Sequence, residues 1–307
     1  MKVLVFGSAN IDRTYSVDHF VVAGETISAS NLTEYCGGKG FNQAIALKRA
    51  GSDVYFAGAI GTDGAMLEKV LLEEKIDISC LKHTEGPTGH AIIQVTPEGQ
   101  NCIIISAGAN GTITTADVEK VLSSFSEGDM VVLQNEISSI NVIVEKAHEK
   151  GMTVVFNPSP FDSRALSCDL EKVDYLLVNE TEGNALSGKT DPAEILDSIH
   201  TQYHRMNIVL TLGKNGSCFM GKDGRFEQCG IYATKVVDTT AAGDTFTGYF
   251  LSELCQSKDI KKALKMAAIA SGISVSRKGA SQSVPSLDET KTIYSSIDHE
   301  TLNVSHS

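Results

Sequence analysis

Six short apolar runs recur along the 307-residue chain, and each is followed by a stretch with helical spacing. The runs are rich in valine, isoleucine, leucine and phenylalanine, and they lie at 2–8, 54–61, 130–136, 153–159, 175–182 and 207–213. Nearly continuous apolar runs are typical of parallel strands that helices cover on both faces. The intervening helices are expected at 42–50, 64–75, 116–125, 139–150 and 193–203. The alternation therefore predicts a three-layer α/β fold with a doubly wound, mostly parallel sheet.

Two segments break this alternation. Residues 13–36 alternate polar and apolar side chains without helical spacing, and residues 88–106 indicate a hairpin that turns at Pro97-Glu98-Gly99. We expect them to form a small antiparallel sheet that acts as a lid over the carboxyl edge of the parallel sheet. The alternative is a simple extension of the main sheet. With a lid, the core comprises 1–12, 37–87 and 107–307, and the discontinuous lid comprises 13–36 and 88–106.

Charge and composition narrow the class of partner. The chain has 26 basic and 38 acidic residues and a formal net charge of −12, so nucleic acid and anionic membranes are unfavourable partners. No apolar run has the length of roughly 20 residues that a membrane span needs. Seven scattered cysteines without a CxxC pair, and no secretory signal, are typical of a cytoplasmic protein with reduced thiols. These features favour chemistry on small molecules.

The segment DTTAAGDTF, which begins at Asp238, is the strongest candidate for chemistry. We expect a strand to end at Asp238 and a helix to begin near Gly243. Small side chains at Ala241, Ala242 and Gly243 would let backbone N–H groups approach an anion at the helix N-terminus. Asp244 would lie in the first turn, where its carboxylate can accept a proton from an attacking hydroxyl. The alternative is a helix cap without chemistry.

Three other turns carry weaker signals. In CGGKGFNQA, three glycines surround Lys39, and Asn42 can donate to hydroxyl groups. Asn179 and Glu182 follow an apparent strand at a spacing that suits either a hydrated Mg²⁺ or a helix cap. The turn TLGKNG at 211–216 ends another apparent strand and can pass a nucleotide.

Taken together, these motifs resemble the PfkB family of carbohydrate kinases, also called the ribokinase family. GGKGFNQA resembles the N-terminal signature of that family, and DTTAAGDTF resembles its C-terminal signature. Six further motifs occur in the family's order, namely GSANID at 7–12, AGAN at 107–110, NPSP at 157–160, NETE at 179–182, TLGKNG at 211–216 and SRKGASQSVP at 276–285. The resemblance covers about residues 1–290 and implies a ribokinase-like fold with a small β-sheet lid.

The resemblance implies transfer of the ATP γ-phosphoryl group to a sugar hydroxyl, here O5 of D-ribose, which gives ribose 5-phosphate. Asp244 corresponds to the general base, and the backbone of Ala241, Ala242 and Gly243 corresponds to the anion hole for the transferring group. The positions that correspond to ATP contacts are Asn179, Thr211, Gly213, Lys214, Gly216, Gly243 and Ala268. Asn179 and Glu182 match the NxxE motif that organises Mg²⁺ in the family.

The resemblance also implies a sugar site, a monovalent cation site and a homodimer that forms through the lids. The positions that correspond to sugar contacts are Asn10, Asp12, Gly37, Gly38, Lys39, Asn42, Ala91, Ile93 and Glu136. Carboxylates at two of them suit a polyol, because they accept hydrogen bonds from hydroxyls. The positions that correspond to the cation site, which is expected to take K⁺, are Asp238, Thr240, Ser274, Arg277, Gly279 and Ser283.

Three residues depart from the family pattern and bear on the identity of the acceptor. They are Arg13 after Asp12, Phe41 inside GGKGFN, and Asn135 before Glu136. Phe41 would add bulk beside the sugar if it faced inward. The alternative acceptors are 2-deoxyribose, a hexose or a nucleoside, and a non-catalytic sugar or nucleotide sensor is a further alternative on the same fold.

Overall fold

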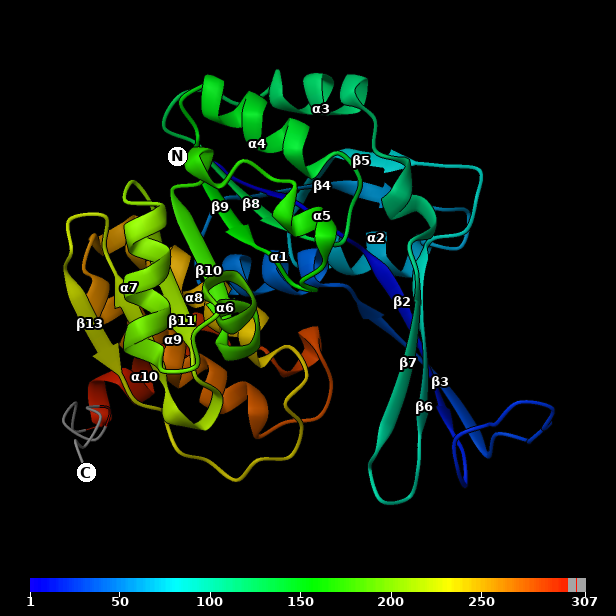
Figure 1. Ribbon diagram of the computed structural model, residues 1–307. Coiled ribbons are helices and arrows are strands. Elements are labelled where there is room, and N and C mark those ends of the chain that lie inside the picture. Colours follow the sequence, from blue (N-terminus) through cyan, green and yellow to red (C-terminus); the bar gives the residue numbers. More distant parts are fainter. Residues whose placement is uncertain (298–301, 303–307) are drawn as a thin grey trace.

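The computed structural model describes residues 1–297 and 302, and its centre is a nine-stranded sheet in the order β13-β12-β11-β10-β9-β8-β1-β4-β5 (Figure 1). The seven strands from β11 to β5 in that order are parallel, whereas β12 runs antiparallel to both of its neighbours, β11 and β13. The strands are β1 Val3–Phe6, β4 Val54–Ile60, β5 Asp77–His83, β8 Met130–Gln134, β9 Thr153–Asn157, β10 Tyr175–Asn179, β11 Asn207–Thr211, β12 Ser217–Met220 and β13 Phe226–Cys229.

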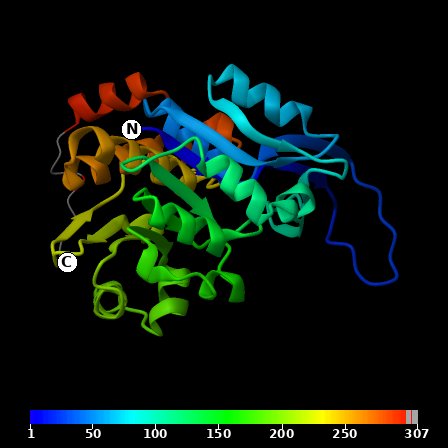
Figure 2. The ribbon, with the colours of Figure 1, turned by 90° about the horizontal axis from the view of Figure 1, so that it is seen from above.

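Helices cover both faces of this sheet, as the α/β prediction requires (Figure 2). The α-helices are α1 Lys39–Arg49, α2 Ala65–Glu73, α3 Thr115–Leu122, α4 Ile140–Glu149, α5 Ser163–Leu166, α6 Glu180–Ser187, α7 Pro192–Gln202, α8 Ala242–Ser257, α9 Ile260–Val275 and α10 Leu287–Ser296. The short 3-10 helices are η1 Gly108–Thr112, η2 Leu170–Lys172, η3 Gly213–Asn215 and η4 Ser281–Ser283.

Alternate side chains of the strands build two separate cores. In β1, Val3 and Val5 pack with α1, α2, α8 and α9, while Leu4 and Phe6 pack with α3, α4 and α7 on the other face. All four side chains are at most 2% exposed. Burial on both faces explains why the apolar runs were nearly continuous rather than alternating. The predicted three layers are therefore confirmed.

A second sheet of four strands, in the order β3-β2-β6-β7, projects from one end of the molecule (Figure 1). Its strands are β2 Asn10–Ser16, β3 Asn31–Gly37, β6 Gly89–Val95 and β7 Asn101–Ser106. It is separate from the main sheet, so the alternative of a simple extension is wrong. The outer pairs are antiparallel, as predicted, but the central pair β2 and β6 is parallel.

The strand expected to end at Asp238 is absent, which corrects the sequence prediction. Residues 231–238 form no helix or strand. The backbone N–H groups of Val237 and Asp238 both donate to Val275 O at the end of α9, at 2.8 and 3.1 Å. Because no neighbouring strand offers a ladder to this segment, its β-branched residues stay in a loop, and Val236 remains 62% exposed. None of the helices within the described residues is long and apolar enough to cross a membrane.

Candidate active site

Asp244 lies in the first turn of α8 and is the focus of the candidate site. The turn before it contains Ala241 in the left-handed region, with φ of 58°, a conformation that alanine rarely adopts. The carboxylate is only 8% exposed, and both of its oxygens accept amide hydrogen bonds, from Asn42 Nδ2 at 3.2 Å and from Gln43 Nε2 at 2.9 Å. Gln134 Nε2 in turn donates to Gln43 Oε1 at 2.7 Å. The carboxylate is therefore held in one orientation by a chain of buried amides.

Two adjoining cavities meet at the N-terminus of α8. One, of about 330 Å³, extends between η3 and α9, and the other, of about 410 Å³, extends over the ends of β9 and β10. Residues common to both are Thr211, Gly213, Thr239, Ala242 and Gly243. Among the predicted nucleotide contacts, Lys214, Gly216 and Ala268 line the first cavity and Asn179 lines the second.

The second cavity also contains the charged groups of the site. Asp244, Glu182 and Lys39 all line it. Burial alone would lower the pKa of Lys39, but the carboxylates of Asp244, Glu136 and Glu182 raise it overall. Lys39 therefore carries a positive charge inside a group of carboxylates. The N–H of Ala242 donates to Thr239 O at 3.2 Å. The N–H groups of Gly243 and Asp244 belong to the first helical turn, where N–H groups have no intrahelical acceptors.

Glu136 connects the end of β8 to the glycine-rich turn before α1. Its Oε2 accepts hydrogen bonds from Ser8 Oγ and from the Lys39 backbone N–H, the latter at 2.9 Å. Gly38 begins the turn with φ of 92°, which favours glycine. Burial raises the pKa of Glu136, although the positive charge of Lys39 opposes the shift. The predicted residues of this turn and Glu136 are thus brought together.

Asp12 lies on β2 and faces the end of β3. A Cβ on Gly37 would lie 2.0 Å from Asp12 Oδ2, so only glycine leaves room for this carboxylate. Burial, and secondarily the negative charge of Glu136, raise the pKa of Asp12 to about 6. The register pairs Asp12 with Ala91 and Thr14 with Ile93, which sets both apolar residues on the same face of the small sheet as Asp12.

The predicted Mg²⁺ residues form a capping box at the start of α6. Glu182 N–H donates to Asn179 Oδ1 at 2.9 Å, and Asn179 N–H donates to Glu182 Oε2 at 3.0 Å. The pair therefore caps the helix, and its position is also compatible with a Mg²⁺ site, because both residues line the 410 Å³ cavity. Among the described residues there is no cluster of three or more histidine, cysteine or acidic side chains that could hold a metal ion.

The predicted cation residues form one cluster of loops beside the start of α8. Asp238 Oδ1 accepts from Thr240 N–H at 2.9 Å and Oδ2 accepts from Gly279 N–H at 3.0 Å. Burial alone would raise the pKa of Asp238, but these hydrogen bonds lower it overall. The hydroxyls of Ser274 and Ser283 are buried and lie 2.6 Å apart. The side chain of the remaining predicted residue, Arg277, pairs with Glu289 on α10 instead of with this cluster.

The three residues that depart from the family pattern do not line either cavity. Phe41 is fully buried in the core between the sheet and α8. Arg13 alternates with Asp12 on β2, and its guanidinium pairs with Glu34 at 2.9 Å and with Asp63 at 3.6 Å. The side-chain amide of Asn135 donates to Pro160 O at 2.6 Å. The expectation that Phe41 would add bulk beside the sugar, conditional on its facing inward, therefore does not apply.

Two residues at the site were missed from the sequence. Gln43 was part of the motif GGKGFNQA but carried no predicted role, although its amide contacts Asp244 directly. Gln134 lies two residues before Glu136 and supports Gln43. The available signal for Gln134 was a polar side chain at the end of an otherwise apolar strand. Neutral amides are common in helices and loops, so neither Gln134 nor Gln43 stood out as a site residue.

Comparison with known proteins gives the same assignment as the motifs. The model of the pfkB family carbohydrate kinases matches residues 1–287. A ribokinase of Staphylococcus aureus is 36% identical over 308 residues, which cover 95% of this chain and 99% of the relative.

Solved structures resemble the whole fold. A ribokinase of Cryptococcus neoformans in complex with ADP has a TM-score of 0.85 at 34% identity and covers 95% of this chain and 99% of its own. A ribokinase of Arabidopsis thaliana complexed with ribose and ATP has a TM-score of 0.85 at 31% identity and covers 95% of this chain and 97% of its own. With a family model that matches nearly all of it, this chain belongs to the PfkB family of carbohydrate kinases.

Proposed function

We propose that the protein transfers the γ-phosphoryl group of ATP to O5 of D-ribose and releases ADP and ribose 5-phosphate. The observation that carries this proposal is the position of Asp244. Its carboxylate lines the 410 Å³ cavity together with Lys39 of the predicted sugar site and Gly243 of the predicted ATP site, and it accepts a hydrogen bond from Asn42. Relatives whose names state ribokinase activity, one solved with ribose and ATP, support the same acceptor.

In the proposed reaction, Asp244 accepts the proton of the O5 hydroxyl as O5 forms a bond to the γ-phosphorus. The bond from that phosphorus to the β–γ bridging oxygen breaks, and its electron pair leaves with ADP. The transferring group is proposed to lie at the Ala241–Gly243 turn, where the N-terminal helix dipole favours negative charge. The N–H of Ala242 donates to Thr239 O, so that of Gly243 is the donor proposed for the transferring group. The positive charge of Lys39 on the cavity wall adds to that stabilisation. Phosphoryl transfer depends mainly on such positioning and charge compensation.

Ribose is favoured among the possible acceptors by the polar groups at the base of the small sheet. Asn10 is 5% exposed, and Asp12 lies beside a second carboxylate at Glu136. Acceptors placed for the hydroxyls of ribose would be left unpaired by 2-deoxyribose, which costs binding energy. Because Phe41 and Arg13 are engaged elsewhere, neither alters the space for the sugar.

Asn179 and Glu182 are the residues that we propose to organise Mg²⁺ with the phosphates of ATP. Mg²⁺ keeps several water ligands and needs only one or two protein oxygens. The pair fits this need, because both residues line the cavity while Asn179 Oδ1 and Glu182 Oε2 also cap α6. When bound, the ion neutralises charge on the phosphates.

The cluster of Asp238, Thr240, Ser274, Gly279 and Ser283, with the Arg277 backbone, is the proposed K⁺ site. It is supported by its buried oxygens next to the anion-hole turn.

We further propose that segments 13–36 and 88–106 act as the lid, that two copies pair through it, and that the protein works in the cytoplasm. The lid is supported by Ala91 and Ile93 on the face of Asp12, and pairing is supported by the exposed apolar residues of β7. The location is supported by seven cysteines that are all unpaired.

The experiment is a measurement of ATP consumption by the purified protein with Mg²⁺, with and without K⁺. The acceptors are ribose, 2-deoxyribose, fructose, adenosine and pseudouridine, and NMR of the product identifies the phosphorylated oxygen. We expect turnover with ribose, phosphorylation at O5 and stimulation by K⁺. Preference for another acceptor would overturn the assignment of ribose but keep the kinase. ATP binding without turnover on any acceptor would instead support a sensor.

A further inference from the structure

Asn110 lies outside both cavities but contacts the predicted sugar site. It belongs to η1, which follows the last strand of the small sheet, and it is 2% exposed. Its Nδ2 donates to Asn10 Oδ1 at 2.7 Å, and its Oδ1 accepts from Ala9 N–H at 3.2 Å. The two ends of the Asn110 amide are therefore both used, and both reach the start of β2.

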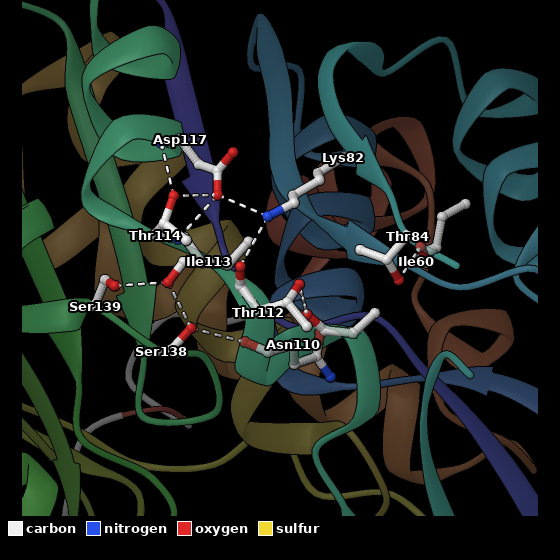
Figure 3. A network of polar contacts seen from close by, with 11 residues as sticks. Ile60, Lys82, Thr84, Asn110, Thr112, Ile113, Thr114, Asp117, Ser138 and Ser139 are labelled. Atoms are coloured by element: carbon white, nitrogen blue, oxygen red, sulfur yellow. Dashed lines mark hydrogen bonds and ion pairs between the residues drawn. The ribbon is translucent and has the colours of Figure 1, made fainter. Parts of the chain in front are cut away.

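The backbone around Asn110 is held by the loop before α4 and by β5 (Figure 3). Asn110 O accepts from Ser138 N–H at 3.0 Å, just before α4. Lys82 Nζ on β5 donates to Thr112 O at 2.8 Å and pairs with Asp117 Oδ2 at 2.7 Å. These contacts fix η1 to the core, so Asn110 presents its amide from a rigid base.

The hydrogen bond between Asn110 and Asn10 lies directly over Gly89, where β6 begins. A Cβ on Gly89 would be 2.1 Å from Asn110 Nδ2 and 2.4 Å from Asn10 Oδ1. Glycine is thus required at this place for the two amides to meet. The contact lies at the junction where β2 and β6 enter the small sheet and β7 leaves it.

We propose that Asn110 is a positioning residue for the sugar acceptor, an inference that rests on the function proposed above. Because Asn110 Nδ2 donates to Asn10 Oδ1, it determines which end of the Asn10 amide is left for the ligand. The remaining Nδ2 of Asn10 donates to a hydroxyl oxygen of the sugar, while Asp12 accepts the proton of a hydroxyl. Without Asn110, the Asn10 amide can rotate and present either end, so one donor to the sugar is lost.

The test compares Asn110→Ala, which removes the donor, with Asn110→Asp, which keeps the size of the side chain. For both variants we expect the KM for ribose to rise about tenfold, the size expected for a lost buried hydrogen bond, with kcat and the KM for ATP within about twofold of wild type. Asn184→Asp is the matched control, since the Asn184 amide is exposed and donates to Lys189 O. Thermal melting verifies that each variant is folded.

A double-mutant cycle with Asn10→Ala separates positioning from a general structural effect. If Asn110 acts through Asn10, its substitution adds little to the KM of the Asn10→Ala protein. Fully additive effects, or an unchanged KM in folded Asn110→Asp, would overturn the inference. Failure of the proposed function is seen separately, because the wild-type protein would then prefer another acceptor, and the cycle is run with that acceptor.

Discussion

Asp244 accepts hydrogen bonds from two side-chain amides, and these bonds determine which substitution tests its role as the base. Asn42 donates to one of its oxygens and Gln43 to the other. Asp244→Asn retains the shape of the side chain while removing the proton acceptor. We expect kcat to fall by about 10²- to 10⁴-fold, the usual contribution of a general base, with binding of ATP retained. Asp288→Asn, at the exposed start of α10, is the control. Turnover near the wild-type rate in Asp244→Asn would rule out its role as the base.

Asp12 should make sugar binding sensitive to pH. Burial, with the negative charge of Glu136, raises its pKa to about 6, so the protonated form accumulates below that pH and loses the charge-assisted hydrogen bond that the carboxylate accepts from a hydroxyl. Between pH 7.5 and 5.5 we expect the KM for ribose to rise about fourfold, in proportion to the loss of the carboxylate. Asp12→Asn should have a higher KM at pH 7.5 and a flatter profile. A flat wild-type profile would contradict the assignment.

At the scale of elements, two glycines on α8 have different structural roles. A Cβ on Gly243 would meet nothing within 4 Å, whereas a Cβ on Gly248 would lie 2.4 Å from Ala46 Cβ on α1. Gly243 therefore leaves space in the cavities, and Gly248 permits close packing of two helices. Gly243→Ala should keep the melting temperature but raise the KM for ATP about tenfold or more, since the new methyl group would stand where we propose that the phosphates bind.

Gly248→Ala on the same helix is the matched comparison. We expect it to lower the free energy of unfolding by about 1–3 kcal/mol, as for other overpacked sites, with the KM for ATP of the folded protein unchanged. The two outcomes are measured by thermal or denaturant unfolding and by steady-state kinetics. Reversal of the pattern, with Gly243→Ala unstable and still active, would contradict the role of the α8 N-terminus.

The elements also show where prediction from sequence succeeded and where it stopped. Strands with two buried faces and helices with regular spacing were predicted to within a few residues, because each pattern reports local burial. The prediction of a strand before Asp238 was wrong, because β-branched residues form a strand only where a neighbouring strand pairs with them. Asn110 and Gln43 were not assigned, because their roles depend on contacts across 100 and 201 positions of the chain.

At the scale of the whole molecule, the small sheet projects from the core and has an exposed edge strand. All residues of β7 are exposed, among them Ile103, Ile104 and Ile105, which are 49%, 60% and 58% exposed. Exposed apolar edges of this kind promote pairing between chains. Ile103 and Ile105 share the face of Ala91 and Ile93, so a partner that covers them would also close the sugar side of the site.

We therefore expect the wild-type protein to sediment at twice its chain mass of 32.8 kDa. The double variant Ile103→Glu, Ile105→Glu should sediment as a monomer, because two carboxylates would be buried in the interface without partners. Its melting temperature should change little, whereas its KM for the sugar should rise, because the site is left open to water. Phe226→Glu is the control, since Phe226 is 47% exposed on β13, at the other end of the molecule (Figure 1). A monomeric wild type, or a double variant that still dimerises, would show that the small sheet does not pair the subunits.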